Sequence, residues 1–244
     1  MKPRLEVADI FRAHGTDYRN RFKNQMPLQH KRAMRAIEIC RTAAMGGHID
    51  RCEACGEQRI SYNSCRNRHC PKCQCLKTER WIEARKDDLL PIPYFHVVFT
   101  LPEELRTVPL ANQRVIYDLL FKAASETLIE LGRDPKFLGA NIGLIAVLHT
   151  WSQTLIHHPH VHCIVTGGGL AKDGIWKASR AGFFLPVKVV SRLYRGKLLA
   201  KLKAANRSRS LRKFPDTRQI DRLYAKEWSV YCKRPFAEPE HVVG

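Results

Sequence analysis

Four histidines lie within six consecutive positions at the start of the segment HHPHVHCIVTGGGL, which spans residues 157–170. His160 and His162 are two residues apart, and residues i and i+2 of a β-strand point to the same face, about 6.5–7 Å apart along the backbone. Two imidazoles at this spacing can bind one metal ion, while Val161 between them points the other way, into the core. The pair is therefore a candidate metal site.

A third ligand is expected from a neighbouring strand. The segment 142–151 (IGLIAVLHTW) predicts a strand, and it is close enough to the strand 160–167 to form an antiparallel hairpin with it. In that pairing His149 lies opposite residues 161–162, and Gln153, nearer the turn, is the second choice. Three imidazoles with open coordination positions suit a divalent ion, Mg²⁺ or Mn²⁺ in turnover and Zn²⁺ or Ni²⁺ adventitiously. The alternative is a polar, hydrogen-bonded strand end without a metal ion.

The residues on either side of the histidine pair are expected to be irregular. His157 and His158 precede a proline, which favours a loop, so we place them outside the ligand set. Residues 167–169 are three consecutive glycines, which favour a turn directly after the strand.

Nine cysteines are present, and six of them lie within residues 52–75. The N-terminal segment has no signal-peptide core, so a metal site is favoured over a disulfide framework. Two C-x-x-C pairs fit a zinc ribbon, in which each pair supplies two thiolates to a tetrahedral zinc ion. The expected zinc ligands are Cys52, Cys55, Cys70 and Cys73. A shell closed by four protein ligands leaves no position for a substrate, so this zinc is expected to be structural.

A second zinc ion is an open alternative. Cys65 and His69 are the first candidates for it, and His48 and Cys75 are further ones. Otherwise these four are packing residues, so the number of zinc ions stays open between one and two.

The helices and strands around these sites indicate two domains. Amphipathic helical patterns precede the cysteine-rich segment, and a charged helix over about 77–90 follows it and stops at Pro-Ile-Pro. We therefore expect a zinc-binding domain over 1–90 and a second domain over 91–244. In the second domain YFHVVFT (94–100) predicts a further strand, and helices are expected over 111–131, 187–205 and 217–232. Strands mixed with helices indicate a layered α/β or α+β domain.

The formal net charge is +19, with 42 Lys and Arg against 23 Asp and Glu, which favours a nucleic-acid partner over a ribosome-like or membrane-surface role. Residues 174–215 contain no Asp or Glu, so this segment is expected to follow a phosphate backbone rather than to be only a solvated helix face. No apolar run is long enough to span a membrane, and we expect a soluble cytoplasmic, nucleoid-associated protein. The side chains expected to contact DNA are Arg192, Arg195, Lys197, Lys201, Lys203, Arg207 and Arg209.

His160-Val161-His162 resembles the HUH motif of the HUH endonucleases, which nick single-stranded DNA. The match extends over essentially the whole chain to the rolling-circle insertion-sequence transposases, the two-tyrosine branch with an N-terminal zinc-binding domain. The relaxase branch of the superfamily takes a third histidine from upstream of its pair, in agreement with His149. The motifs that carry the resemblance, in order, are YNSCRNRHCPKCQ (62–74), FHVVFTLP (95–102), LHTWSQTL (148–155) and HPHVHCIVTGGGL (158–170).

The resemblance implies an α+β fold, in which a helical zinc-ribbon domain precedes an antiparallel sheet flanked by helices. It also implies metal-dependent nicking and strand transfer of single-stranded DNA at transposon ends. A tyrosine hydroxyl attacks a phosphodiester and leaves a 5′-phosphotyrosine and a free 3′-OH. The metal ion polarises and orients the scissile phosphate.

The resemblance departs at the C-terminus. In the family the catalytic tyrosines follow a segment like PFAEPEHVVG, and here that segment ends at Gly244. Tyr194, Tyr224 and Tyr231 lie in other contexts, so the nucleophile is expected beyond Gly244. We therefore expect a fragment with an incomplete catalytic domain that binds metal and DNA without forming the tyrosine adduct.

Two other functions remain. One is a non-enzymatic zinc-ribbon DNA-binding protein, and the other is a water-using metallonuclease, for which no nearby carboxylate offers a general base. The oligomeric state is left open, although an apolar surface beside the histidines would favour dimers.

Overall fold

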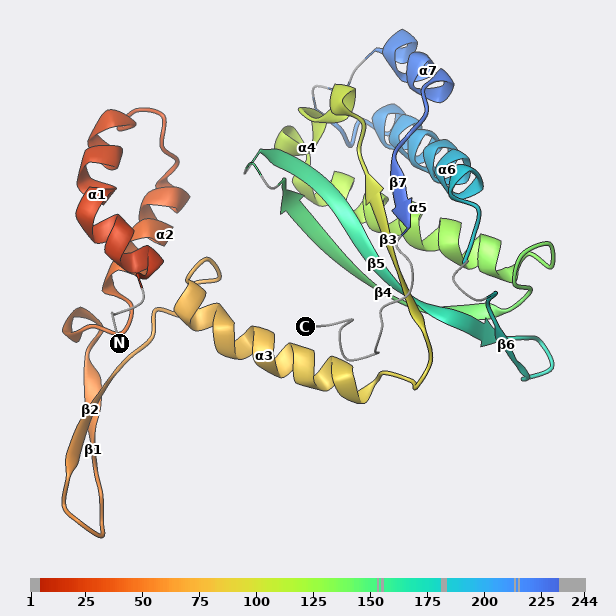
Figure 1. The fold of residues 1–244 in the computed structure, drawn as a ribbon. Helices are drawn as coiled ribbons and strands as arrows, with labels where there is room; N and C mark the ends of the chain where they lie inside the picture. The colour runs from red at the N-terminus through yellow and green to blue at the C-terminus, as the bar shows by residue number, and fades with distance from the viewer. Residues whose placement is uncertain are drawn as a thin grey trace. The chain divides into compact units, whose positions relative to one another are not determined.

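The computed structural model describes residues 5–152, 154, 156–180, 184–212, 214 and 216–232, and the chain forms two compact units (Figure 1). The first is Met1–Asp88 and the second is Leu89–Gly244. Within the described ranges, no helix combines the length and the apolar character that a membrane span requires.

The first unit is mainly helical. It contains α1 (Val7–Arg21), α2 (Leu28–Ile39), a short 3₁₀ turn (Ala43–Met45), the antiparallel pair β1 (Gly47–Arg51) and β2 (Gln58–Tyr62), and α3 (Pro71–Asp87). The helix expected over 77–90 begins earlier, because Pro71 occupies its first turn, where a missing N–H is tolerated. The buried apolar cluster of this unit is small and consists of Ala8, Ile37, Cys40 and Cys70. So small a core makes a stabilising metal ion physically useful.

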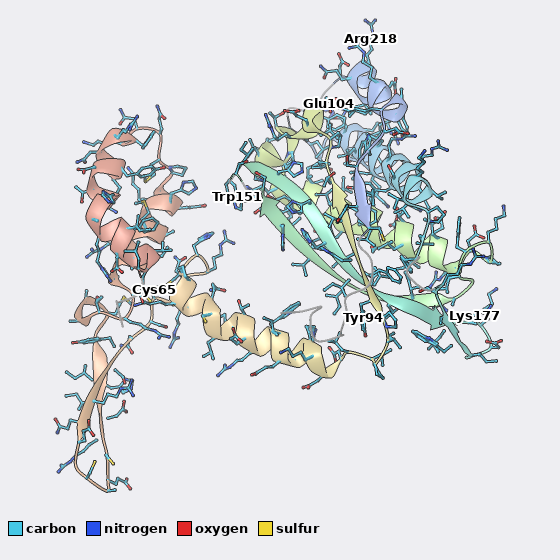
Figure 2. The ribbon with its side chains drawn as sticks, viewed as in Figure 1. Cys65, Tyr94, Glu104, Trp151, Lys177 and Arg218 are labelled. Carbon is cyan, nitrogen blue, oxygen red and sulfur yellow. The ribbon has the colours of Figure 1, made fainter. Side chains whose placement is uncertain are left out.

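The second unit is built on an antiparallel sheet. Its strands are β3 (Tyr94–Thr100), β4 (Asn141–Trp151), β5 (His157–Leu170), β6 (Trp176–Ala178) and β7 (Val230–Cys232). The order across the sheet is β4-β5-β3-β7, and β6 pairs with the far end of β5. Figure 2 labels Tyr94 at the start of β3 and Trp151 at the end of β4. The α+β class with an antiparallel sheet is therefore confirmed.

The helices of this unit cover one face of the sheet. They are a 3₁₀ turn (Glu103–Leu105), α4 (Val108–Ala111), α5 (Gln113–Arg133), α6 (Val187–Arg207) and α7 (Thr217–Ala225), and α5 and α6 pack against each other and against the strands. Alternate residues of β3 and β5 face this core, such as Val97, Phe99, Val161 and Cys163. The residues between them lie on the opposite face, hereafter the open face, which carries the histidines.

Two parts of the second unit differ from the sequence-based expectation. The glycines at 167–169 lie inside β5 rather than in a turn, and a Cβ on Gly168 would be 2.5 Å from the carbonyl oxygen of Lys177 in β6. Neighbouring backbones therefore approach too closely there for a side chain. The helix expected over 217–232 ends at Ala225, and the β-branched and aromatic residues after Trp228 form β7 instead.

Candidate functional site

Two adjacent strands bring three histidines together on the open face. His149 of β4 lies directly opposite His160 of β5, and His162 follows on the same face of β5. One ring nitrogen from each residue lies within 4.8 Å of the others. The three residues are called the histidine cluster below. The expected hairpin is present, but His149 pairs with His160 rather than with residues 161–162, so the partner lies at least one position closer to the turn than expected.

The tautomer of His160 is fixed by its backbone neighbour. Its Nδ1 lies 2.7 Å from the carbonyl oxygen of His158, which can only accept a hydrogen bond. Nδ1 must therefore carry the proton, so the lone pair of His160 is on Nε2. His160 can offer that atom as a metal ligand.

His162 is held from the other side by a histidine that the sequence reasoning missed. His96 of β3 lies on the open face, and its Nε2 is 2.7 Å from Nδ1 of His162. The other nitrogen of His162, Nε2, is buried and lacks a hydrogen-bond partner among the described residues. A buried polar atom left in this way is suited to a metal ion, so the cluster fits the divalent ion expected from the sequence.

The electrostatics of the site favour the neutral form of two of its imidazoles, those of His149 and His162. Burial, together with the neighbouring His149, His96 and His160, lowers the pKa of His162 to about 4. Burial and the nearby His160 also lower the pKa of His149. Neutral imidazoles are the form that binds metal, so these ligands do not have to lose a proton near neutral pH.

The other candidates near this site are placed differently. His157 and His158 lie in β5 rather than in a loop, and neither joins the histidine cluster. His157 Nε2 instead lies 3.1 Å from the hydroxyl of Tyr117 in α5. Gln153, the second choice for a ligand, lies outside the described residues.

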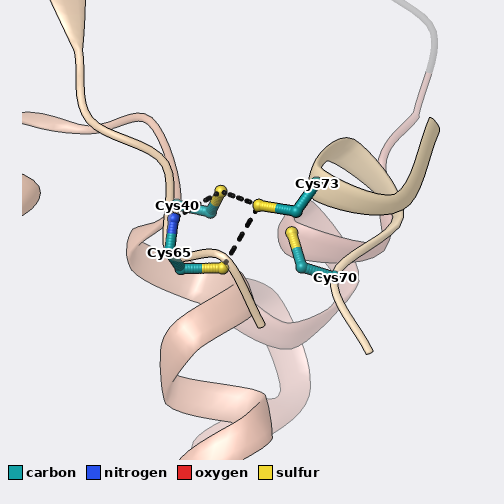
Figure 3. A group of neighbouring side chains, drawn as sticks. All are labelled: Cys40, Cys65, Cys70 and Cys73. Atoms are coloured by element: carbon teal, nitrogen blue, oxygen red, sulfur yellow. Dashed lines mark hydrogen bonds between the residues drawn. The ribbon is translucent and has the colours of Figure 1, made fainter. Parts of the chain in front are cut away.

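Four cysteines come together in the first unit: Cys40, Cys65, Cys70 and Cys73, hereafter the cysteine cluster (Figure 3). Cys40 follows the last residue of α2, Cys65 lies in the loop after β2, and Cys70 and Cys73 lie at the start of α3. The Sγ atoms of Cys40 and Cys65 are each 3.6 Å from Sγ of Cys73. Sulfurs about 2.3 Å from a tetrahedral ion would lie about 3.8 Å apart, so the cluster matches a four-thiolate zinc shell.

The thiols of this cluster share their protons unequally. Burial raises the pKa of Cys65 to about 12. Burial also raises the pKa of Cys73, but hydrogen bonds from the thiols of Cys40, Cys65 and Cys70 outweigh it and lower the value to about 7. One sulfur of the cluster is therefore prepared to act as a thiolate while its neighbours donate protons to it.

The structure does not bring the four expected zinc ligands together. Cys70 and Cys73 belong to the cysteine cluster, whereas Cys52 and Cys55 lie in the exposed turn between β1 and β2. Five-residue strands extend that turn about 16 Å from the base of the hairpin. Cys65 is part of the four-cysteine set rather than of a second site with His69, whose backbone and ring instead bond to its loop neighbours. His48 and Cys75 are exposed, and neither joins a group of potential ligands in the described structure.

The basic residues of α6 divide into two groups. Lys197 and Lys201 form ion pairs with Glu130 and Glu126 of α5, and Lys203 pairs with Asp221 of α7. Acidic residues distant in sequence therefore offset much of the charge in this stretch. Arg192 and Arg195 instead line a pocket in the N-terminal half of α6. Arg207, the last residue of the helix, and Arg209, just after it, are exposed.

The three tyrosines after the histidines have different environments. Tyr194 is fully buried in the core, and burial raises its pKa. Tyr224 lies under the ammonium group of Lys203, 4.8 Å from the ring centre. Tyr231 is 56% exposed on β7, opposite Val98 of β3.

Comparisons with known proteins match both units to transposases. Residues 10–101 match the family model described as a transposase zinc-binding domain, and residues 143–244 match the model described as a putative transposase. The chain is 49% identical, over 98% of its length, to the putative transposase y4qJ of Sinorhizobium fredii strain NBRC 101917 / NGR234. It is 36% identical, over 57% of its length, to the transposase for insertion sequence element IS801 of Pseudomonas savastanoi pv. phaseolicola. It spans 62% and 33% of these relatives, respectively.

Among solved structures, two of the conjugative relaxase TrwC are similar at low identity. The complex with oriT DNA in metal-free form is 12% identical, with 61% of this chain and 69% of that chain covered and a TM-score of 0.38. The complex with a 27-mer DNA is 14% identical over the same shares, 61% and 69%, with a TM-score of 0.37.

Proposed function

We propose that this chain, whose two units match transposase family models, is a rolling-circle insertion-sequence transposase of the HUH superfamily and acts in DNA transposition. In this role the second unit binds single-stranded DNA at transposon ends and holds a scissile phosphate over the open face. The observation that carries the proposal is the histidine cluster, with its three ring nitrogens within 4.8 Å of one another.

His149, His160 and His162 would hold a divalent ion, Mg²⁺ or Mn²⁺. When bound, such an ion polarises the scissile phosphate and stabilises charge on its oxygens. His158 contributes a carbonyl that orients His160, and His96 contributes a ring nitrogen that orients His162. These partners keep the ligating atoms in place before substrate arrives, so little reorganisation is needed when it binds.

The attacking tyrosine is proposed to lie outside the described residues. Tyr194 and Tyr224 are engaged in packing and in a cation–π contact, and Tyr231 lies on a strand rather than on a helix. In this proposal the described residues provide the metal ligands and the DNA surface, and a tyrosine elsewhere provides the nucleophile.

We propose the cysteine cluster as the structural zinc site of the first unit. A zinc ion there would join the end of α2, the loop after β2 and the start of α3, which share only a small apolar core. Cys52 and Cys55 are outside this shell.

Metal-dependent DNA binding tests the proposal. We would measure the fluorescence anisotropy of a labelled single-stranded oligonucleotide with and without Mn²⁺, using the unaltered chain, His160→Ala and the control His30→Ala, in which an exposed residue of α2 is replaced. Binding that is strengthened by Mn²⁺ in the unaltered chain and the control, but not in His160→Ala, would support the function. DNA binding that changes neither on addition of Mn²⁺ nor in His160→Ala would instead favour a non-enzymatic zinc-domain DNA-binding protein.

The position of the nucleophile has its own test. The chain incubated with Mn²⁺ and a labelled single strand should give no covalent adduct on denaturing gels. A tyrosine-linked adduct formed by this chain would refute the assignment of the nucleophile to residues elsewhere.

A further inference from the structure

A pocket of about 390 Å³ lies where the first turns of α6 meet β7 and the end of β3. Three cationic residues line it, Lys188, Arg192 and Arg195, and Glu227 is the one carboxylate among its lining residues. Thr100 and Tyr231 complete its polar and aromatic wall. We call this the cation pocket.

The helical repeat places the three cations together. Lys188, Arg192 and Arg195 stand at positions i, i+4 and i+7 of α6, which lie on one face of a helix. Lys188 lies in the first turn of α6, where free backbone N–H groups add partial positive charge, and Arg192 and Arg195 follow one and two turns later. The pocket is therefore electrostatically suited to a phosphate group.

Two of these cations are available to a ligand. Within the described part of the chain, neither Lys188 nor Arg192 forms an ion pair, and both are exposed. Arg195 is positioned differently, because its guanidinium donates a 2.6 Å hydrogen bond to the carbonyl oxygen of Lys226. The lysines further along α6 are ion-paired, so among the described residues of the helix the exposed cations without an ion pair are Lys188 and Arg192 at the pocket and Arg207 at the C-terminal end.

One lining residue of the cation pocket lies one strand spacing from the histidine cluster. Thr100 of β3, which lines the pocket, lies directly opposite His160 in the sheet. Directly opposed residues of antiparallel strands have Cα atoms about 4.5–5.5 Å apart. Tyr231 lies opposite Val98, which in turn lies opposite His162. The cations come from α6, on the helix-covered side, so a nucleic-acid strand that crosses the open face reaches them by passing over β7, the last strand of the order.

We propose that the cation pocket binds the phosphodiester backbone of single-stranded DNA next to the phosphate held at the histidine cluster. Lys188 and Arg192 contact the phosphates, and the exposed ring of Tyr231 stacks on a base. This assignment rests on the proposed function. It predicts the path of the DNA, which runs from the histidine cluster past Thr100 to the start of α6.

The salt dependence of DNA binding tests the assignment. For single strands the slope of log Kobs against log salt concentration changes by about 0.7 for each phosphate contact. Lys188→Ala/Arg192→Ala should therefore reduce the magnitude of the slope by about 1.4, measured by anisotropy with a single-stranded oligonucleotide of random sequence. The matched control is Lys197→Ala/Lys201→Ala, which removes the same charge from α6 outside the pocket.

The stacking role has a separate readout. Tyr231→Ala should weaken binding about 5- to 150-fold, which is the usual effect of losing one base–aromatic stack, whereas Tyr231→Phe should bind nearly as the unaltered chain does. Loss of affinity in both variants would overturn the stacking assignment.

The outcomes separate the pocket from the proposed function. A slope change in Lys188→Ala/Arg192→Ala no larger than in the control would overturn the pocket assignment while leaving Mn²⁺-dependent binding intact. Absence of single-strand binding by the unaltered chain would overturn the proposed function itself, and with it the pocket assignment. All substituted residues except Tyr231 are on the surface of α6. Circular dichroism of each variant would test whether it is folded.

Discussion

Replacing His96 with alanine should weaken divalent-metal binding at the histidine cluster by about 10- to 100-fold. His96 Nε2 is 2.7 Å from His162 Nδ1, which leaves His162 Nε2 as the atom that faces a metal ion. Without this partner the imidazole of His162 can rotate or change tautomer, so the ligand is no longer held ready. The expected loss corresponds to about 1.4–2.7 kcal/mol of binding free energy.

The measurement is a titration with Mn²⁺ of protein that carries zinc at the cysteine cluster only, in which electron paramagnetic resonance gives the concentration of free Mn²⁺. His96→Gln is the informative second variant, because its side-chain amide can reach the position of the imidazole Nε2 and accept the same hydrogen bond. It should recover most of the affinity lost in His96→Ala. His30→Ala controls for the general loss of a histidine.

A folded His96→Ala protein with the Mn²⁺ affinity of the unaltered chain would refute this reasoning. Equal weakening by His96→Ala and His96→Gln would refute the hydrogen-bond explanation while keeping a role for the ring itself. A purely structural role would lower the unfolding free energy without changing the Mn²⁺ affinity.

Three further predictions concern zinc and the core. Cys65→Ser should abolish stoichiometric zinc binding, read by atomic absorption, and lower the helical circular dichroism, whereas Cys55→Ser should leave the zinc of the cysteine cluster in place. Gly168→Ala should destabilise the second unit by about 1–3 kcal/mol in urea unfolding, because its Cβ would meet the Lys177 carbonyl. Gly196→Ala should be neutral or stabilise the unit by up to about 1 kcal/mol, because Gly196 is in a helix and the space around its Cβ is open. Tyr194→Phe should lower the free energy of unfolding by only about 0.5–1.5 kcal/mol, because the hydrogen bond from the Tyr194 hydroxyl to the Thr100 carbonyl oxygen is 3.4 Å long. Tyr194→Ala should lower it by about 3–5 kcal/mol, because it leaves a cavity in the core. If the two variants of any of these comparisons had equal effects, the role assigned to that residue would be contradicted.

Local features of the second unit could be predicted from the sequence. The strand expected over 94–100 coincides with β3, because aromatic and β-branched residues fill both faces of a pleated segment. The approach of His149 to His160 was also accessible, because a short connection between two strands restricts their register. The one-position error arose because the exact centre of the hairpin was unknown, and the hydrophobic pattern does not record it.

Non-local features could not be predicted. Cys40 is 25 residues from Cys65 and follows an ordinary amphipathic helix, so its spacing gives no sign of a metal ligand. His96 is 66 residues from His162, and they meet only because β3 pairs with β5. The ion pairs of α6 were missed for the same reason, because their carboxylates come from other helices. Charge counted along the chain therefore overstated the free positive charge of this helix.

The position of β4 in the sheet couples metal binding to the dynamics of the strand. In the strand order β4-β5-β3-β7, β4 is an edge strand, and it carries His149 while β5 carries the other two ligands. An ion bound by ligands from β4 and β5 would link these two strands in addition to their backbone hydrogen bonds. Opening of β4 must release the ion, so each tenfold rise in free metal above its Kd should slow amide exchange in β4 by about tenfold. The edge strand would thus exchange its amide protons rapidly before metal binds and slowly afterwards.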